Sequence, residues 1–372
     1  MRDLVQKMKI IQGFEKVQKR EILDCRIKSL KEMIHYSGWD ISSFELLILC
    51  EAITYRYGYI NYKQSHISGV PYVTSTNMDV HRCLLEKLGI HYECKEINSN
   101  EEGWEQIKIL LDGHIPVLVE LDGSVFMKRR KDHKMDLHYI SYVLVVGYDE
   151  ETREIAIVLT QNSQTDTYIT LKYEDFQDAR VRECCPYKTT GMCYYIIDTA
   201  NLENVELKNL IGSSIKNISI TMLEGEGMDD IYSDKIDITD FSVGLPAMKR
   251  FISDYKIKSL RLLSSKKISS LYQLELLILR NNIQYGTLTC YREEFAKGLH
   301  MIAEKYNMTE CEEAAILFEK SCGYWKRLIW QIGTLAKNKN KISFVGMRKI
   351  AGISEKIYNL EKRAFSLIAD IQ

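Results

Sequence analysis

Apolar residues recur along the first 200 positions with two different periods. Between residues 25 and 36 they have helical spacing, with Ile27, Leu30 and Ile34 on one face. The same spacing predicts three more helices, at about 43–55, 80–88 and 102–111. Nearly continuous or short apolar runs then predict strands at 115–121, 138–146, 155–160, 168–171 and 194–197. A group of helices followed by antiparallel strands is typical of an α+β domain.

From about residue 200 helical spacing dominates. Long amphipathic stretches predict helices at 270–281, 291–306, 310–335 and 346–369. The acidic, irregular stretch 224–242 is interpreted as a linker or mobile loop. We therefore expect two domains, an α+β domain over residues 1–200 and an all-helical domain over residues 201–372.

The overall charge of the chain is nearly balanced. Its 50 Lys and Arg residues and 51 Asp and Glu residues give a net charge of −1. No global field therefore favours nucleic acid or anionic lipid, and we expect neither nucleic acid nor a membrane as a partner. Apolar runs shorter than a membrane span, and an N-terminus without signal-peptide features, predict a cytoplasmic protein. No glycine-rich phosphate-binding motif is found, so no nucleotide cofactor is expected.

The chain contains ten cysteines, and one of them has the position of a nucleophile. Most are expected to be buried thiols that packing accounts for. Cys25 differs because it stands at the start of a predicted helix, where the helix dipole favours a thiolate. Cys184, Cys185 and Cys193 lack the two-residue hook that is usual for structural zinc, so no metal site is expected.

Among the eight histidines, His138 has a distinctive position. It begins the predicted strand 138–146, so a polar ring stands at the edge of an apolar element. The other histidines lie in helical or loop contexts, where a surface position or a satisfied core position explains them. A base at a strand end and a thiol at a helix start have the general geometry of a cysteine–histidine pair. Cys25 and His138 are therefore the candidates for such a pair.

A series of short segments, spread over most of the chain, matches one known family in order and spacing. The segments are 24–30, 36–38, 41–43, 115–121, 138–149, the strand to Asn162, and 285–296 with Gly286, Thr287, Tyr291 and Arg292. In these segments the chain resembles the butirosin-biosynthesis acyltransferase family. That family has a papain-like fold, related to the peptidase domains that cleave bacteriocin leaders.

The resemblance implies that Cys25 and His138 act on acyl groups. Enzymes of this family take an acyl chain from an acyl carrier protein and pass it to an amine. The implied partners are therefore an acyl carrier protein and a small amine or diamine, and no cofactor is implied beyond the carrier's phosphopantetheine. Within this group the chain, low in Gly and rich in Lys and Ile, resembles a clostridial amide synthetase of closthioamide (polythioamide) biosynthesis.

The third catalytic position departs from the family. Its usual aspartate falls on residues 160–163, which contain no acid. Gln161 stands in the aligned position, whereas Asn162 would supply the amide that papain-like enzymes use. Either side chain can accept a hydrogen bond from His138, and we favour Asn162.

Three further sets of residues complete the predicted site. The resemblance implies that the backbone N–H of Cys25 and the side chain of Gln18 hold the oxyanion. A basic run shortly before His138 is the local patch suited to an acidic carrier protein, and it includes Lys128, Arg129, Arg130 and Lys131. The residues predicted to line the substrate cleft are Tyr55, Tyr59, Tyr291 and Arg292.

Two other functions are compatible with the sequence. A cysteine peptidase would use the same fold and the same Cys–His pair, but it would need an open groove for an extended chain. A non-catalytic binding protein is the second alternative, because residues 160–163 lack the usual acid. Aminolysis of a thioester requires exclusion of water, so we expect the helical domain to cover the cleft, which favours the acyltransferase.

Overall fold

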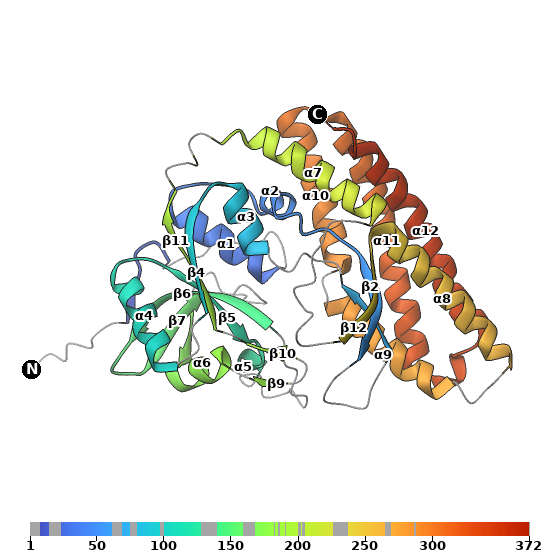
Figure 1. Cartoon of the computed structure of the whole chain (residues 1–372), viewed down its shortest axis with the longest axis horizontal. Helices are drawn as coiled ribbons and strands as arrows, with labels where there is room; N and C mark the ends of the chain where they lie inside the picture. Colours follow the sequence, from blue (N-terminus) through green and yellow to red (C-terminus); the bar gives the residue numbers. More distant parts are fainter. Residues whose placement is uncertain are drawn as a thin grey trace, which may run out of the picture. The chain divides into compact units, whose positions relative to one another are not determined.

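The chain divides into two compact units in a computed structural model (Figure 1). The first unit comprises residues 1–43 and 81–205, and the second comprises 44–80 and 206–372. This division differs from a single boundary near residue 200, because segment 44–80 belongs to the second unit. The structure describes residues 8–14, 24–61, 69–74, 80–96, 100–127, 140–158, 168–181, 183–184, 187–189, 191–199, 202, 205–225, 237–264, 269–285 and 288–371.

The first unit is built around a seven-stranded antiparallel sheet. Its strands are β1 (Lys9–Ile10), β4 (His91–Glu96), β5 (Val117–Asp122), β6 (Ile140–Asp149), β7 (Glu154–Val158), β8 (Ile169–Lys172) and β11 (Met192–Asp198). They follow the order β4, β11, β5, β6, β7, β8, and β1 pairs with β6. All six residues of β5 are buried, which agrees with its continuous apolar run.

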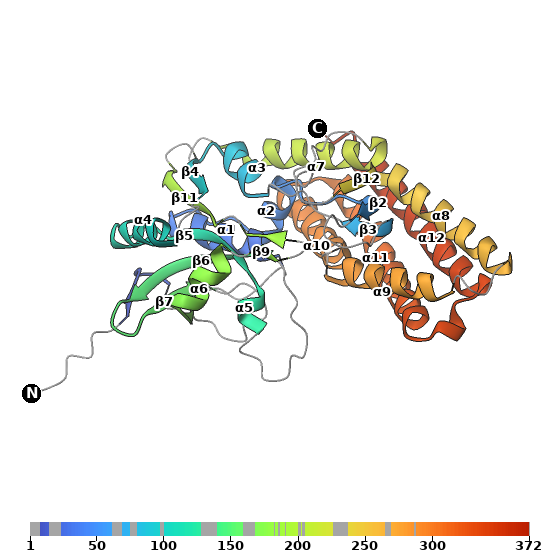
Figure 2. The same cartoon turned by 60° about the horizontal axis from the view of Figure 1, so that its bottom comes forward.

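Helices cover the central strands of this sheet. They are α1 (Cys25–Tyr36), α3 (Val80–Lys87), α4 (Asn100–Asp112), α5 (Ser124–Met127) and α6 (Tyr173–Arg180), and a short pair, β9 (Glu183–Cys184) and β10 (Tyr187–Lys188), accompanies them. Figure 2 shows α1 and α6 on opposite sides of β5 and β6. The predicted α+β class is confirmed, as are the helices expected over 25–36, 80–88 and 102–111, within two residues at each end.

Gly147 of β6 is the point at which β1 joins the sheet. Ile10 pairs with Gly147 and Lys9 pairs with Tyr148, next to a register shift between β6 and β7. A Cβ atom on residue 147 would lie 2.2 Å from the Lys9 carbonyl oxygen and 2.9 Å from Ile10 Cα. Glycine is therefore needed for the close approach of the two backbones.

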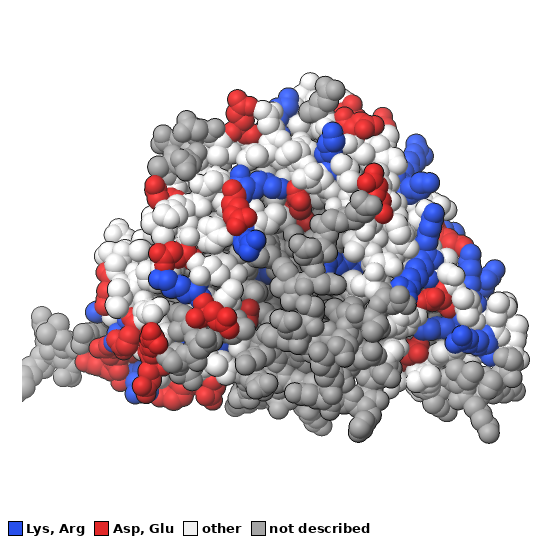
Figure 3. Space-filling model, viewed as in Figure 1, with Lys and Arg blue, Asp and Glu red and all other residues white. Residues whose placement is uncertain are grey.

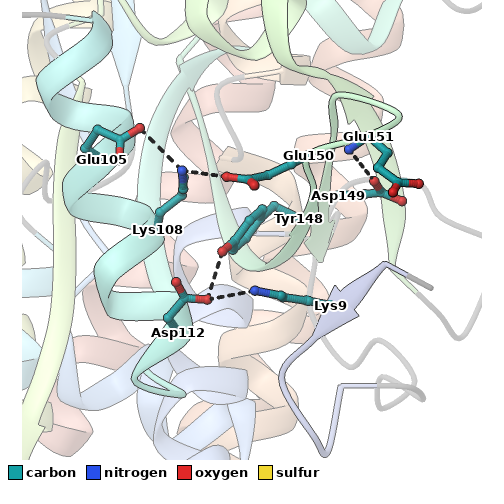
Figure 4. A network of polar contacts seen from close by, with 8 residues as sticks. All are labelled: Lys9, Glu105, Lys108, Asp112, Tyr148, Asp149, Glu150 and Glu151. Atoms are coloured by element: carbon teal, nitrogen blue, oxygen red, sulfur yellow. Dashed lines mark hydrogen bonds and ion pairs between the residues drawn. The ribbon is translucent and has the colours of Figure 1, made fainter. Parts of the chain in front are cut away.

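A surface network connects the end of α4 to β6 and β1 (Figure 4). Tyr148 Oη donates to Asp112 Oδ1 at 2.8 Å, and Lys9 Nζ lies 3.6 Å from the same oxygen. Lys108 Nζ lies 2.6 Å from Glu150 Oε1 in the turn after β6. Most of these charged groups are well exposed, so each ion pair contributes at most about 1 kcal/mol. The buried strands are the main source of stability at this corner.

The second unit combines a small antiparallel sheet with long helices. The sheet has the order β12 (Asp237–Val243), β2 (Arg56–Asn61), β3 (Val70–Thr74). Figure 1 shows the blue strand β2 beside β12, among helices from the C-terminal half of the chain. These helices are α7 (Leu207–Glu224), α8 (Gly244–Ser264), α9 (Ser269–Tyr285), α10 (Leu288–Tyr306), α11 (Thr309–Lys337) and α12 (Phe344–Ile368), with a 3-10 turn at Lys339–Lys341.

Aromatic rings fill the core of this unit. Phe295 of α10, Phe318 of α11 and Phe365 of α12 are fully buried. The ring centroids of Phe295 and Phe318 are 5.0 Å apart, and those of Phe318 and Phe365 are 4.9 Å apart. Each of α10, α11 and α12 therefore contributes one ring to a shared cluster.

Two expectations about the second unit are corrected by the structure. The helix predicted over 43–55 is shorter, because α2 spans Ser43–Leu49 and Glu51 has a left-handed φ of 51°. The stretch 224–242, interpreted as a linker, contains most of β12, which pairs with β2. The C-terminal region is helical as predicted, but three strands accompany its helices.

Charge is unevenly distributed despite the small net charge. Helix α8 carries five basic residues (Lys249, Arg250, Lys256, Lys258 and Arg261) and a single acidic one, Asp254. Figure 3 shows basic side chains gathered over this helix. Across the described residues, no helix is both long enough and apolar enough to cross a bilayer.

Candidate active site

Cys25 is the first residue of α1, and its side chain is buried with 7% exposure. Asp24 caps the helix, since its Oδ1 accepts the backbone N–H of Arg26 at 2.8 Å. The Asp24 carbonyl accepts the first helical hydrogen bond, from Lys28 N at 3.1 Å. The predicted helix start at Cys25 is therefore confirmed. The positive end of the helix dipole lies at the thiol, which favours its thiolate form.

Asp24 also forms a buried ion pair with Arg26. Nη2 of Arg26 lies 2.7 Å from Asp24 Oδ2, and Nε lies 3.1 Å from Oδ1. The two residues are only 4% and 9% exposed. Asp24 therefore has two roles, as the cap of α1 and as the counter-ion of Arg26.

Helix α1 packs directly on β6, the strand that follows the predicted base. Ser29 Oγ donates to the carbonyl oxygen of Tyr142 at 3.4 Å. Ser29 lies one turn after Cys25, and β6 begins at Ile140, two residues after His138. The element that carries the predicted nucleophile and the strand that follows the predicted base are thus in contact.

A group of buried polar residues surrounds this contact. Tyr142 Oη donates to Glu120 Oε2 of β5 at 3.0 Å. The ring of His81, from α3, lies 4.4 Å from the Tyr142 ring and 5.0 Å from the Tyr194 ring, measured between centroids. His81 is 1% exposed, and its Nε2 has no hydrogen-bond partner among the described residues.

The electrostatics of His81 place Arg26 and Asp24 close to it. Burial and, to a smaller extent, the charge of Arg26 lower the pKa of His81 to about 3, whereas Asp24 opposes the shift. His81 is therefore neutral at neutral pH. The sequence left His81 as either a surface or a satisfied core position, and its spacing to Leu84, Leu85 and Leu88 on one helix face was a usable signal of burial.

Asp122 is another buried acid, and no sequence pattern indicated a role for it. It is 1% exposed and accepts hydrogen bonds from the Ser124 N–H and Ser124 Oγ, both at 2.9 Å. In the pairing of β5 with β6, Asp122 lies opposite Ile140. Glu120, two residues earlier on β5, lies opposite Tyr142. Because side chains alternate along a strand, Asp122 and Glu120 share one face of the sheet.

Most of the other predicted site residues lie outside the described part of the chain. These are Gln18, Lys128, Arg129, Arg130, Lys131, His138, Gln161 and Asn162. Their roles as oxyanion donor, docking patch, general base and orienting amide stay predictions.

The four residues predicted for the substrate cleft all lie in the second unit. Tyr55 is buried, with its ring 6.0 Å from that of Trp325. Tyr59 is partly buried, and its hydroxyl donates to Asp254 at 2.6 Å. Tyr291 is fully buried. These contacts are internal to the unit, and the assignment of the residues to a cleft stays a prediction.

Arg292, the fourth of these residues, is part of a buried ion pair. Its Nε and Nη2 lie 3.0 Å from Oε1 and Oε2 of Glu361, and both residues have 0% exposure. Glu361 Oε1 also accepts from Ser321 Oγ at 2.9 Å and from Trp325 Nε1 at 2.8 Å. Glu361 thus joins α10, α11 and α12 through one carboxylate.

No group of His, Cys, Asp and Glu side chains suited to a metal ion is found within the described ranges. Cys94 is exposed, and Cys83 is partly exposed, whereas Cys25, Cys50, Cys193, Cys311 and Cys322 are buried. Cys193 shows the usual result of burial, because its pKa is raised to about 12 by desolvation. A buried thiol therefore needs a local source of stabilisation to react, and the helix start provides one for Cys25.

A comparison with curated proteins finds no match for this chain. A comparison with protein families does find one, over residues 24–159. The matched segment begins at Asp24, the cap of α1, and ends just after β7, so it includes both Cys25 and His138. In this segment the chain is similar to the family described as butirosin biosynthesis protein H, N-terminal.

Proposed function

We propose that this protein is an acyltransferase in specialised-metabolite biosynthesis, with Cys25 as the nucleophile and His138 as the general base. One observation carries the proposal. Cys25 is the buried first residue of a capped helix that packs on β6, within the segment similar to butirosin biosynthesis protein H. A nucleophilic cysteine needs this kind of position because the helix dipole favours the thiolate.

The proposed reaction has two steps. With its proton held by His138, the Cys25 thiolate attacks a carrier-protein thioester and the carbon–sulfur bond to phosphopantetheine breaks. The carrier leaves as a thiol, because His138 returns the proton to its sulfur. An amine then attacks the acyl-enzyme, its proton passes to His138, and an amide is released as the Cys25 sulfur leaves. Gln18 and the Cys25 N–H hold the oxyanion in both steps, and Asn162 or Gln161 orients His138.

The finer parts of the proposal concern substrate and setting. The acyl donor is presented by an acyl carrier protein that docks on the basic run Lys128–Lys131. The acceptor is a small amine or diamine, and we place the reaction in cytoplasmic amide synthesis of the polythioamide type. A cysteine peptidase is the alternative enzyme, because the same Cys–His pair would serve it.

Intact mass spectrometry tests the nucleophile. The protein is incubated with an acyl-loaded carrier protein, and we expect a mass increase equal to one acyl group. Cys25→Ala should abolish the adduct, whereas Cys94→Ala, at an exposed cysteine, should retain it. Addition of a diamine should then release an amide. Absence of both adduct and amide would exclude the acyltransferase, and cleavage of a peptide instead would favour the peptidase.

Charge reversal tests the docking patch. Lys128→Glu combined with Arg130→Glu should slow acylation from the carrier protein but leave acylation from a small pantetheine thioester unchanged, because only docking is lost. Lys249→Glu combined with Arg261→Glu on α8, a basic helix among the described residues, is the matched control and should change neither rate. Equal losses in the two pairs would contradict docking at 128–131.

A further inference from the structure

The cap of α1 is a buried carboxylate on the residue that precedes the proposed nucleophile. Asp24 precedes Cys25 in the chain, and its carboxylate is buried with 4% exposure of the residue. A neighbouring carboxylate disfavours a thiolate, and burial makes this effect stronger because little water screens it. The cap that creates the favourable helix start would therefore oppose the charge that the thiol needs.

Arg26 supplies the compensating charge at short range. Its guanidinium contacts both carboxylate oxygens of Asp24, at 2.7 Å from Nη2 to Oδ2 and 3.1 Å from Nε to Oδ1. Its backbone N–H donates to the same carboxylate at 2.8 Å. The side chains of Arg26 and Asp24 are 11% and 3% exposed, so the pair is closed off from solvent.

The influence of this pair on another buried group is already visible at His81. The charge of Arg26 lowers the pKa of His81, and that of Asp24 opposes this effect with a smaller contribution. Among the described residues, other ionisable groups on or against α1 include Lys28, Lys31, Glu32 and His35 on α1, Glu120 on β5 and Tyr142 on β6. Lys28 and Glu32 form a second buried pair at 4.0 Å. Arg26 contacts Asp24 directly, with Nη2 2.7 Å from Oδ2.

We propose that Arg26 is a positioning residue for the reaction of Cys25. By pairing with Asp24 it lets the carboxylate cap α1 without opposing the Cys25 thiolate. This inference rests on the proposed function only in taking Cys25 as the nucleophile. It adds a two-residue charge balance, Asp24 with Arg26, that sets how readily the thiol ionises.

The test measures the ionisation of Cys25 without any acyl donor. The rate of alkylation by iodoacetamide is followed over a range of pH, and the peptide that contains residue 25 is quantified by mass spectrometry. Cys94, exposed on β4, is quantified in the same samples as an internal control. Three variants are compared with the natural chain, namely Arg26→Gln, Asp24→Asn, and the double variant.

The variants separate charge from structure, because Asn retains an oxygen that can cap the helix. In Arg26→Gln the midpoint of the Cys25 profile should rise by about one pH unit, and in Asp24→Asn it should fall. The double variant, which has neither charge, should return close to the natural midpoint. The Cys94 profile should be unchanged throughout.

Two results would overturn the inference. The first is an Arg26→Gln variant whose Cys25 alkylation midpoint equals that of the natural chain. The second is a double variant whose midpoint is shifted as far as that of Arg26→Gln, since removing Asp24 cannot rescue a purely structural role of Arg26. If Arg26→Gln does not fold, the Asp24→Asn variant alone tests the inference. A Cys25 alkylation midpoint that is unchanged or higher in this variant would reject the charge balance. Because no acyl donor is used, a failure of acyl transfer with these shifts present would count against the proposed function alone.

Discussion

Buried polar side chains are the residues whose environment differs most from what their type alone suggests. His81 is the clearest case, because its neutral ring packs at tilted angles against Tyr142 and Tyr194, where a charged ring would be poorly solvated. Burial lowers its pKa to about 3, far below that of a histidine in an unfolded chain. Its protonation is therefore coupled to unfolding.

This coupling predicts a specific loss of stability in acid. Below a pH of about 6.5 the unfolded chain binds a proton at His81 that the folded chain does not bind, so the free energy of unfolding decreases as pH falls. His81→Phe retains an aromatic ring but cannot bind this proton. It should therefore reduce the slope of the free energy of unfolding against pH by up to about 1.4 kcal/mol per pH unit, between pH 6 and the folded pKa of about 3.

Urea unfolding at a series of pH values measures the two slopes. At pH 7.5 both proteins contain a neutral ring at position 81, so their stabilities should agree within about 1 kcal/mol and provide the control. Parallel slopes in acid would show that His81 becomes protonated within the folded protein.

In the second unit, the buried ion pair between Arg292 and Glu361 gives a second prediction about single residues. Glu361→Gln should lower the free energy of unfolding by about 3–5 kcal/mol, because it leaves the charge of Arg292 buried without its counter-ion. Glu355→Gln is the matched control on the same helix. Its partner, Lys256, is partly exposed, so the expected loss is at most about 1 kcal/mol. Urea unfolding of both variants gives the comparison, and similar losses would contradict the role of Glu361.

At the scale of elements, local pattern predicted those whose buried face is continuous. Helix α1 and the helices from α9 to α12 were predicted from the helical spacing of their apolar residues, and α11 and α12 bury such residues along their length. Strands β5 and β6 were predicted because they are buried on both faces. The strands β2, β3 and β12 were not, since none has a regular alternation and Pro71 lies within β3.

The reason for this failure is visible in the sheet itself. Pro71 is tolerated because β3 is an edge strand in the order β12, β2, β3. Strand β12 contains Asp237 and Asp240, which made its sequence resemble a loop, and only its pairing with β2 makes it a strand. Similarly, α2 stops at Leu49 although apolar residues continue, because the following chain enters β2.

The junction of β1 and β6 gives a prediction at this scale. Gly147→Ala should destabilise the protein by about 1–3 kcal/mol, because its Cβ would overlap the backbone of Lys9 and Ile10. Gly323→Ala on α11 is the control. No atom outside its own helix turn lies within 4 Å of its added Cβ, so the substitution should stabilise by about 0.5–1 kcal/mol. Thermal unfolding distinguishes the two, and a neutral Gly147→Ala would show that β1 contributes little.

At the scale of the whole molecule, the chain enters the second unit twice. Segment 44–80 precedes most of the first unit, yet β2 pairs with β12, and Tyr57 Oη donates to Asp254 of α8 at 2.9 Å. Tyr57 and Tyr55 are buried there by residues from the C-terminal half of the chain. A cut near residue 205 therefore separates this segment from its partners.

Truncation tests this organisation. A fragment of residues 1–205 should aggregate, because residues 44–80 would expose Tyr55, Tyr57 and the unpaired edge of β2. The same fragment with 44–79 replaced by a flexible Gly/Ser linker should be more soluble. Solubility and circular dichroism of the two fragments give the measurement. A soluble, cooperatively folding 1–205 fragment would show that segment 44–80 does not need the C-terminal half.

The sequence by itself determined the α+β class, the helical C-terminal region and the position of Cys25 at a helix start, because periodicity and capping are local properties of a chain. Only the tertiary structure decided which unit contains segment 44–80 and which acid pairs with Arg292. It also decided that Asp24, Arg26, His81 and Glu120 are buried around α1 and β6. These outcomes depend on which surfaces meet, and residues that are distant in sequence meet through packing that no local pattern specifies.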